Sequence, residues 1–161
     1  MGKNLDKTNV MRVLDKKKLQ YQYYTYDSSI QGAEEVAECL GQEQFRLYKT
    51  LVTVGKSKEH YVFMVPGGKK LDLKKAAKAA GEKSLEMILQ KDLLPLTGYI
   101  HGGCSPIGMK KQYKTFIDLS ASKLDTIFFS AGRVGFQVEM KLADLQQAVP
   151  VVPADITIDT E

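Results

Sequence analysis

A glycine-rich stretch in the second half of the chain carries residue types that could take part in chemistry. Residues 97–111 contain four glycines, a histidine, a cysteine, a serine followed by proline, and two terminal lysines. Glycines permit turns that other residues cannot make, and they leave backbone amides accessible to a ligand. Composition alone leaves two interpretations: the stretch only reverses the chain, or it binds a ligand. We predict a binding loop whose amides at Gly102 and Gly103 face that ligand.

A lysine interrupts the apolar face of a predicted strand at residues 46–54. One face of this strand carries Leu47, Lys49 and Leu51. Such a lysine can blunt a sheet edge, or its stem can pack while its ammonium group reaches solvent. It can also lie in a site, where it would hold a phosphate or polarise a carbonyl oxygen. The sequence leaves all three roles open.

Three further residues fall at or just after the ends of predicted strands. Ser130 and Arg133 follow a predicted strand at residues 126–129, and loops held by a sheet often carry function. Tyr26 closes an aromatic run predicted to be a strand. Its tyrosines either pack on the sheet or stack on a nucleic-acid base.

The periodicity of apolar residues predicts five helical segments and seven strands. The helices are 8–17, 33–40 ended by Gly41, 73–80 capped by Asp72, a single turn at 90–94 closed by Pro95, and 142–149. The strands are 21–27, 46–54, 60–65, 84–88, 114–119, 126–129 and 135–140. The segments 46–54 and 60–65 are predicted to form a hairpin. From Pro150 onward, an acidic tail is expected to be poorly ordered.

Length and composition favour a single domain over residues 1–161, with an N-terminal helix within 1–20 and an acidic tail at 150–161. No apolar run reaches the roughly 18 residues of a membrane helix. The first residues lack the apolar segment of a secretory signal, so we expect a cytoplasmic protein with no membrane partner. Two cysteines and two histidines predict neither a disulfide framework nor a metal site.

The charge distribution is compatible with a polyanionic partner. The net charge is +4, and the last seven residues hold three acids and no base, so residues 1–154 carry +7. This suits nucleic acid, although many enzymes without such a partner are equally basic.

Four motifs in order resemble the YbaK/EbsC family of single-domain aminoacyl-tRNA deacylases, which is related to the editing domain of bacterial prolyl-tRNA synthetases. The motifs are Phe45–Leu51, Leu73–Lys78, Thr97–Lys111 and Ile127–Arg133, and the resemblance spans about residues 21–149. It implies an α+β fold with a mixed sheet curled into a partly open barrel and surrounded by helices. It also implies hydrolysis, without a cofactor, of cysteine wrongly attached to proline tRNA. Cys-tRNA(Cys) is a further expected substrate.

The resemblance also implies roles for particular residues. Lys49 matches the essential lysine of the family, and Gly102 matches a glycine whose main chain contacts the substrate ester. The remaining expected substrate-binding residues are Tyr26, Tyr99, Gly103, Ser105, Ser130, Arg133 and Gln137. The chain departs from the family at residues 30–33, where relatives often have Phe-Gly, and at Gln137, where some have an acid. These departures leave the amino-acid selectivity open.

An aminoacyl ester is already activated, so a deacylase needs mainly to position it and to stabilise an oxyanion. The sequence offers no convincing Ser/His/Asp set, and the family likeness implies attack by the substrate thiol or by water. Expected partners are the acceptor end of aminoacylated tRNA and prolyl-tRNA synthetase. Three alternatives remain: a deacylase for alanine or another small residue, a non-catalytic module that binds the tRNA acceptor, and a protein that binds a small molecule.

Overall fold

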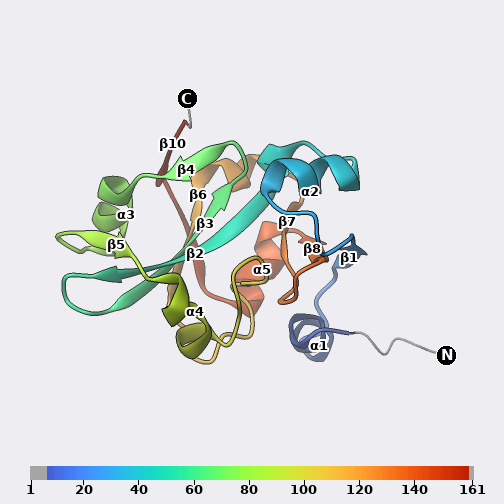
Figure 1. Ribbon diagram of the computed structural model, residues 1–161, viewed down its shortest axis with the longest axis horizontal. Helices are drawn as coiled ribbons and strands as arrows, with labels where there is room; N and C mark the ends of the chain where they lie inside the picture. Colours follow the sequence, from blue (N-terminus) through green and yellow to red (C-terminus); the bar gives the residue numbers. More distant parts are fainter. Residues whose placement is uncertain (1–6, 160–161) are drawn as a thin grey trace.

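The computed structural model describes residues 7–159, and its main feature is an eight-stranded mixed sheet with helices on both faces (Figure 1). The strands follow the order β1 (Gln22–Thr25), β8 (Phe136–Met140), β7 (Ile127–Ser130), β2 (Leu47–Gly55), β3 (His60–Pro66), β6 (Lys114–Asp118) and β9 (Val151–Ala154), and β5 (Leu85–Met87) also pairs with β2. Within the described residues the outermost strands, β1 and β9, do not pair with each other, so the sheet stays open. The predicted mixed, unclosed sheet is confirmed.

The pairing of β2 leaves part of one edge uncovered. Along one edge β2 forms the predicted antiparallel hairpin with β3, from Tyr48↔Pro66 to Val54↔His60. Along the other edge, β7 runs parallel to β2 only as far as Tyr48, and β5 begins to pair only at Thr53. In the described part of the chain, residues 49–52 therefore have no neighbouring strand on this side.

The helices begin and end largely where their capping residues predict. The Thr8 hydroxyl accepts from Met11 N (3.3 Å) at the start of α1 (Asn9–Lys16), and the Asp72 carboxylate accepts from Lys74 N (2.9 Å) at the start of α3 (Leu73–Ala80). The other helical segments are α2 (Ala33–Leu40), α4 (Gln90–Thr97), α5 (Leu142–Ala148) and the 3-10 turns η1 (Gln44–Arg46) and η2 (Leu119–Lys123). No helix within residues 7–159 is long and apolar enough to cross a membrane.

The two faces of β2 pack against different helices. Val52 and Tyr48 join the core that contains the buried residues of α1 and α5, whereas Leu51 packs against α3 and Leu47 against α2. Because side chains alternate along a strand, Lys49 lies on the face of α2 and α3, and Thr50 lies on the opposite face. A cavity at the uncovered edge of β2 can therefore contact residues from both faces.

Two expectations are wrong. Pro95 does not end its helix, because α4 continues to Thr97 and is closed by Gly98. Proline removes only one backbone hydrogen bond, and the Thr97 hydroxyl adds one by donating to Leu93 O (2.8 Å).

The C-terminal segment is also more ordered than its acidic composition indicated. Strand β9 pairs in parallel with β6, and β10 (Thr157–Asp159) pairs with β4 (Lys69–Leu71), a short strand that the sequence analysis missed. Ile156, which lies between β9 and β10 in the sequence, is fully buried. The acidic residues on either side of it led the sequence analysis to expect an exposed tail. Residues 1–6, which belong to the N-terminal segment 1–20, and residues 160–161, which include the last acid of the tail, lie outside the described residues.

Candidate active site

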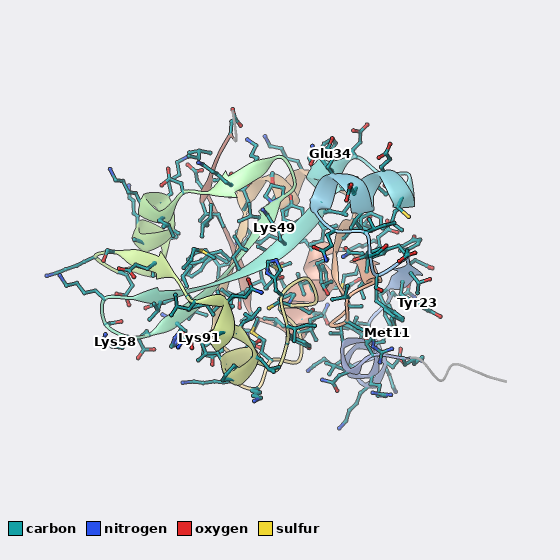
Figure 2. All side chains as sticks on the ribbon, in the orientation of Figure 1. Met11, Tyr23, Glu34, Lys49, Lys58 and Lys91 are labelled. Carbon is teal, nitrogen blue, oxygen red and sulfur yellow. The ribbon has the colours of Figure 1, made fainter. Side chains whose placement is uncertain are left out.

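A cavity of about 250 Å³ lies at the uncovered edge of β2. It is lined by residues 47–51 of β2, by Ser130 of β7 and Gln137 of β8, by Leu93 of α4, and by loop residues that precede α2 or follow α4. Figure 2 shows Lys49 on β2 near the centre of the molecule. Five expected site residues come together here: Lys49, Gly102, Tyr26, Ser130 and Gln137.

Lys49 brings an unpaired positive charge to the cavity. Its side chain is exposed, and it forms no ion pair within residues 7–159. A lysine that blunts a sheet edge or reaches solvent needs no cavity beside it, whereas this one borders a partly apolar hollow. A substrate oxygen in that hollow would find a cation without a competing carboxylate.

Thr50 is a polar lining residue that the sequence analysis missed. Its Oγ1 atom is buried and has no hydrogen-bond partner among the described residues. Buried hydroxyls are normally paired, so an unpaired one beside a cavity indicates a ligand atom or water as its partner. The only sequence signal was its position next to Lys49, since a threonine in a strand is otherwise unremarkable.

The backbone of Thr50 faces the same gap. Leu47 O accepts from Gly67 N on the β3 side (2.8 Å), whereas Val52 O accepts from Ile88 N on the opposite edge (3.3 Å). Because successive residues of a strand direct their backbone groups to opposite edges, the N–H and C=O of Thr50 share the edge of Val52. The site therefore offers an unpaired hydroxyl and strand backbone groups together.

Ser130 and Gln137 form a second wall of the cavity, at the end of β7 beside β2. They are directly paired across the antiparallel ladder of β7 and β8. The Ser130 hydroxyl accepts from Gly132 N (3.1 Å), which holds the corner that follows β7. The Gln137 amide makes no hydrogen bond to any described residue, so its donors and acceptor are available to a ligand. Tyr26 joins this wall through its backbone N–H, which donates to Gly135 O (2.9 Å).

The two central glycines of the 98–111 loop have different roles. Gly102 lines the cavity at φ +87°, and its N–H makes no hydrogen bond within the described chain. Gly103, whose amide was also expected to be accessible, instead donates to Ile100 O (3.0 Å). A Cβ atom on Gly103 would lie 3.1 Å from Val134 N, so glycine here lets the loop approach the corner after β7. Gly103 positions Gly102 and offers no free amide.

Four of the expected site residues do not line the cavity: Gly103, Tyr99, Ser105 and Arg133. The Tyr99 hydroxyl donates to Ile107 O (2.5 Å), and burial raises the pKa of Tyr99 to about 12. Ser105 is fully buried, and its hydroxyl accepts from Ile107 N (3.3 Å). Tyr99 and Ser105 thus hold the loop from within. Arg133 is exposed, and its guanidinium carbon lies 5.0 Å from the centre of the Phe136 ring.

Cys104 lines the cavity but is a poor nucleophile. Burial raises the pKa of its thiol to about 12, and the thiolate is the reactive form. The thiol therefore stays protonated near neutral pH. Among the described residues, no group of three or more His, Cys, Asp or Glu side chains is arranged to hold a metal ion.

The rest of the lining is mainly apolar. Beside the histidine of the loop, His101, it includes these apolar residues: Ile30 before α2, Val36 of α2, Leu51 of β2, Leu93 of α4 and Val134. The sequence analysis did not assign the apolar residues among these to the site, because an apolar residue at helix or strand spacing usually belongs to the core. The volume suits a small acyl group and part of a sugar, with a cation, an amide and a hydroxyl around it.

The geometry of this cavity agrees with the proteins to which the chain is similar in sequence. The chain belongs to the aminoacyl-tRNA editing domain family, whose model matches residues 27–148. It is 49% identical over 140 residues, 86% of this chain and 85% of the relative, to the Enterococcus faecalis protein named "Putative Cys-tRNA(Pro)/Cys-tRNA(Cys) deacylase EbsC". The family expected from the sequence motifs is confirmed.

More distant relatives extend this picture. A segment of the proline–tRNA ligase of Thermosipho melanesiensis is 34% identical over 81 residues, which is 50% of this chain and 14% of the ligase. A crystal structure described as "a putative trans-editing enzyme for prolyl tRNA synthetase" superimposes with a TM-score of 0.84 and 23% identity, covering 98% of this chain and 99% of that one. At this identity, the structural likeness shows the fold.

Proposed function

We propose that this protein is a trans-editing hydrolase that removes cysteine from Cys-tRNA(Pro), with Cys-tRNA(Cys) as a second substrate. The observation that carries the proposal is the meeting of Lys49 with the unpaired Gly102 amide around a cavity of about 250 Å³. The name of the Enterococcus faecalis relative, at 49% identity, supports the same substrates. We further propose that the protein acts in the cytoplasm alongside prolyl-tRNA synthetase.

The site suits an ester that already has a good electrophilic carbonyl. In the proposed complex, the Gly102 N–H donates to the ester carbonyl oxygen and stabilises the negative charge that develops there. Lys49 holds a ribose or phosphate oxygen, and the Thr50 hydroxyl and Gln137 amide orient the acyl group. Such positioning can supply a large share of the rate for an activated ester.

The nucleophile in this proposal comes from the substrate or from water. In the first route, the cysteinyl sulfur attacks its own carbonyl carbon, the C–O bond to the ribose breaks, and the ribose oxygen takes the thiol proton. The resulting cyclic thioester is then hydrolysed. In the second route, a water attacks the carbonyl directly. Cys104 takes no part in either route, because its raised pKa keeps the thiol protonated.

Deacylation of purified Cys-tRNA(Pro), with and without prolyl-tRNA synthetase, tests the proposal. We expect Lys49→Ala to lower kcat/KM by at least about 100-fold, since it removes the charge that orients the ester. Lys56→Ala, which removes an exposed lysine at the end of the same hairpin, should leave the rate unchanged. Full activity in Lys49→Ala would reject the assignment.

Parallel substrates separate the competing functions. A methyl group and a thiol differ little for an apolar pocket, so alanine is the first substrate to compare with cysteine. Faster release of alanine than of cysteine would identify a deacylase for another small residue. Binding of charged and uncharged tRNA without release of amino acid would identify a non-catalytic module. If Ser-tRNA(Pro), which lacks the thiol, is cleaved as fast as Cys-tRNA(Pro), the attacking group is water.

A further inference from the structure

The two sides of the cavity carry opposite charge. One wall comes from residues 26–36, and the surrounding segment 19–46 contains five acids and a single base, Arg46, whose side chain donates to Gln42. The other side comes from α4 and the loop after it, where residues 87–111 contain three lysines and a single acid. Figure 1 shows α2 and α4 on opposite sides of β2. A polyanion approaching the cavity is repelled on the α2 side and attracted on the α4 side.

The α4 side also exposes apolar surface. Leu89, Leu94 and Ile100 are 62%, 50% and 57% exposed, although Leu93 between them faces the cavity. Among the described residues, four of the nine exposed large hydrophobic side chains lie within residues 87–100. Apolar surface gathered next to a binding cavity usually marks an interaction site. We call the set Leu89, Leu94, Ile100, Lys91, Lys110 and Lys111 the α4 rim.

The lysines of the α4 rim are held beside the helix and remain unpaired. Lys110 N donates to Thr97 O (3.0 Å), and the Lys110 side chain runs past Gly98, the residue that ends α4. The Lys111 ammonium lies 5.8 Å from the centre of the Tyr113 ring, and the Tyr113 hydroxyl donates to Leu96 O (2.9 Å). Neither of these lysines, nor Lys91, forms an ion pair with another residue between 7 and 159.

This inference rests on the proposed function. If that function holds, the cavity is too small for the whole acceptor end, and a binding surface is needed beside it. A cavity of about 250 Å³ accommodates an aminoacyl group and part of a ribose, so the adenine and the preceding nucleotides must lie outside it. Single-stranded nucleic acid binds where phosphates find cations and bases find side chains to stack on, which are usually aromatic. In this region the exposed apolar side chains are aliphatic, and they offer the bases apolar contact without ring stacking. The α4 rim offers both at the side of the cavity that does not repel phosphate.

We propose that the α4 rim binds the single-stranded 3′ end of tRNA. The bases lie on Leu89, Leu94 and Ile100, and Lys91, Lys110 and Lys111 neutralise the phosphates between them. The terminal aminoacyl ester then enters the cavity past Leu93. The rim recognises the acceptor end as a single strand and does not depend on the identity of the tRNA body.

Two double variants test this proposal, Lys110→Ala/Lys111→Ala and Leu94→Ser/Ile100→Ser. With Cys-tRNA(Pro), we expect each to raise KM about tenfold. The cysteine ester of adenosine has no phosphate, so its cleavage should decline far less in the same variants. The lysine variant should also reduce the dependence of log K on log salt by about 1.4, since each phosphate contact on a single strand contributes roughly 0.7.

Matched controls lie on other surfaces. Lys16→Ala/Lys17→Ala removes two neighbouring exposed lysines at the end of α1, and Val152→Ser removes a residue of β9 that is 52% exposed. Both should keep the wild-type KM for Cys-tRNA(Pro). An unchanged KM in the two rim variants would overturn the proposal.

Other occupants of the α4 rim give distinct results. A loss seen only when prolyl-tRNA synthetase is present would identify a protein-docking surface and reject the proposal, as would a change of oligomeric state in the rim variants. If the wild-type protein cleaves neither Cys-tRNA(Pro) nor the cysteine ester of adenosine, the proposed function fails. Binding of a short single strand ending in CCA then tests separately whether the α4 rim binds nucleic acid. In that case, binding about tenfold weaker in the rim variants would uphold the inference, and equal binding would reject it.

Discussion

Two Gly-Gly turns in this protein have similar composition and opposite roles. Gly67 and Gly68 follow β3 and precede two lysines, and Gly102 and Gly103 follow α4 in a loop that also ends in two lysines. In the first turn, Gly67 is buried, and its N–H donates to Leu47 O (2.8 Å). In the second, the Gly102 N–H has no partner among the described residues and borders the cavity.

The difference lies in what surrounds each turn. The turn at Gly67 is packed between η1 and the start of α2, where a Cβ atom would lie 2.5 Å from Gln44 O and 2.9 Å from the Ala33 methyl group. The loop at Gly102 lies over the uncovered edge of β2, where Thr50 also leaves a hydroxyl unpaired. Unpaired polar groups in a folded protein are costly, so their concentration at one edge is a stronger sign of a binding site than glycine content.

The largest expected effect on stability is at the packed turn. Gly67→Ala should lower the free energy of unfolding by about 2 kcal/mol, because its new methyl group meets rigid backbone. Urea denaturation measures this loss, and deacylation per folded molecule should stay near wild type. Gly55→Ala is the contrasting change, since the atoms nearest its Cβ would all belong to the Glu82 carboxylate, which can move aside at the cost of its hydrogen bonds from Ser57 and Tyr61. Equal destabilisation by the two changes would contradict this packing argument.

Gly103→Ala should mainly affect activity. Its methyl group would press on the backbone of Val134 and separate Gly102 from the wall formed by Ser130 and Gln137. We expect kcat/KM for Cys-tRNA(Pro) to fall about tenfold, because small displacements of oxyanion donors are costly. Gly81→Ala, at a helix end where the added Cβ would have no atom of residues 7–159 from elsewhere in the fold within 4 Å, should reduce stability without changing the rate. A wild-type rate in Gly103→Ala would show that the loop adapts.

Thr50→Val tests the unpaired hydroxyl. We expect kcat/KM to fall about fivefold, since one hydrogen bond to the substrate is lost, while stability stays the same or rises. Thr53→Val on the same strand is the contrasting change. The Thr53 hydroxyl donates to Tyr61 O (3.1 Å), so its loss should cost about 1 kcal/mol of stability. If Thr50→Val behaves like Thr53→Val, the hydroxyl serves the fold and not the substrate.

The smallest expected effect concerns Cys104. Its folded pKa, raised to about 12, exceeds the ordinary value of 9.0, so the folded state keeps the proton longer than the unfolded state. This contribution to stability is complete below pH 9 and is lost as the pH rises from 9 toward 12. Cys104→Ser should therefore show a shallower loss of unfolding free energy above pH 9, with deacylation at pH 7.5 close to wild type. A large loss of activity would mean that the thiol takes part in the reaction.

Local sequence predicted most of the elements, because caps and periodicity act over a few residues. Thr8, Asp72 and Gly41 mark helix ends through contacts within one turn, and alternation identified the hairpin of β2 and β3. Strands β4 and β10 were missed, because three residues are too few for a periodic signal and their pairing joins positions about 90 residues apart.

For the candidate site, the sequence by itself determined the family through four motifs in order, and it identified Lys49 and Gly102 as the residues to test. Only the tertiary structure decided which residues share the cavity. It brought Ser130 and Gln137 to the edge of β2 and added Thr50. It left four expected residues outside the lining: Tyr99, Gly103, Ser105 and Arg133. The physical reason is that the cavity exists where β7 ends its pairing with β2 before β5 begins. No single segment of the chain encodes such a gap between strands.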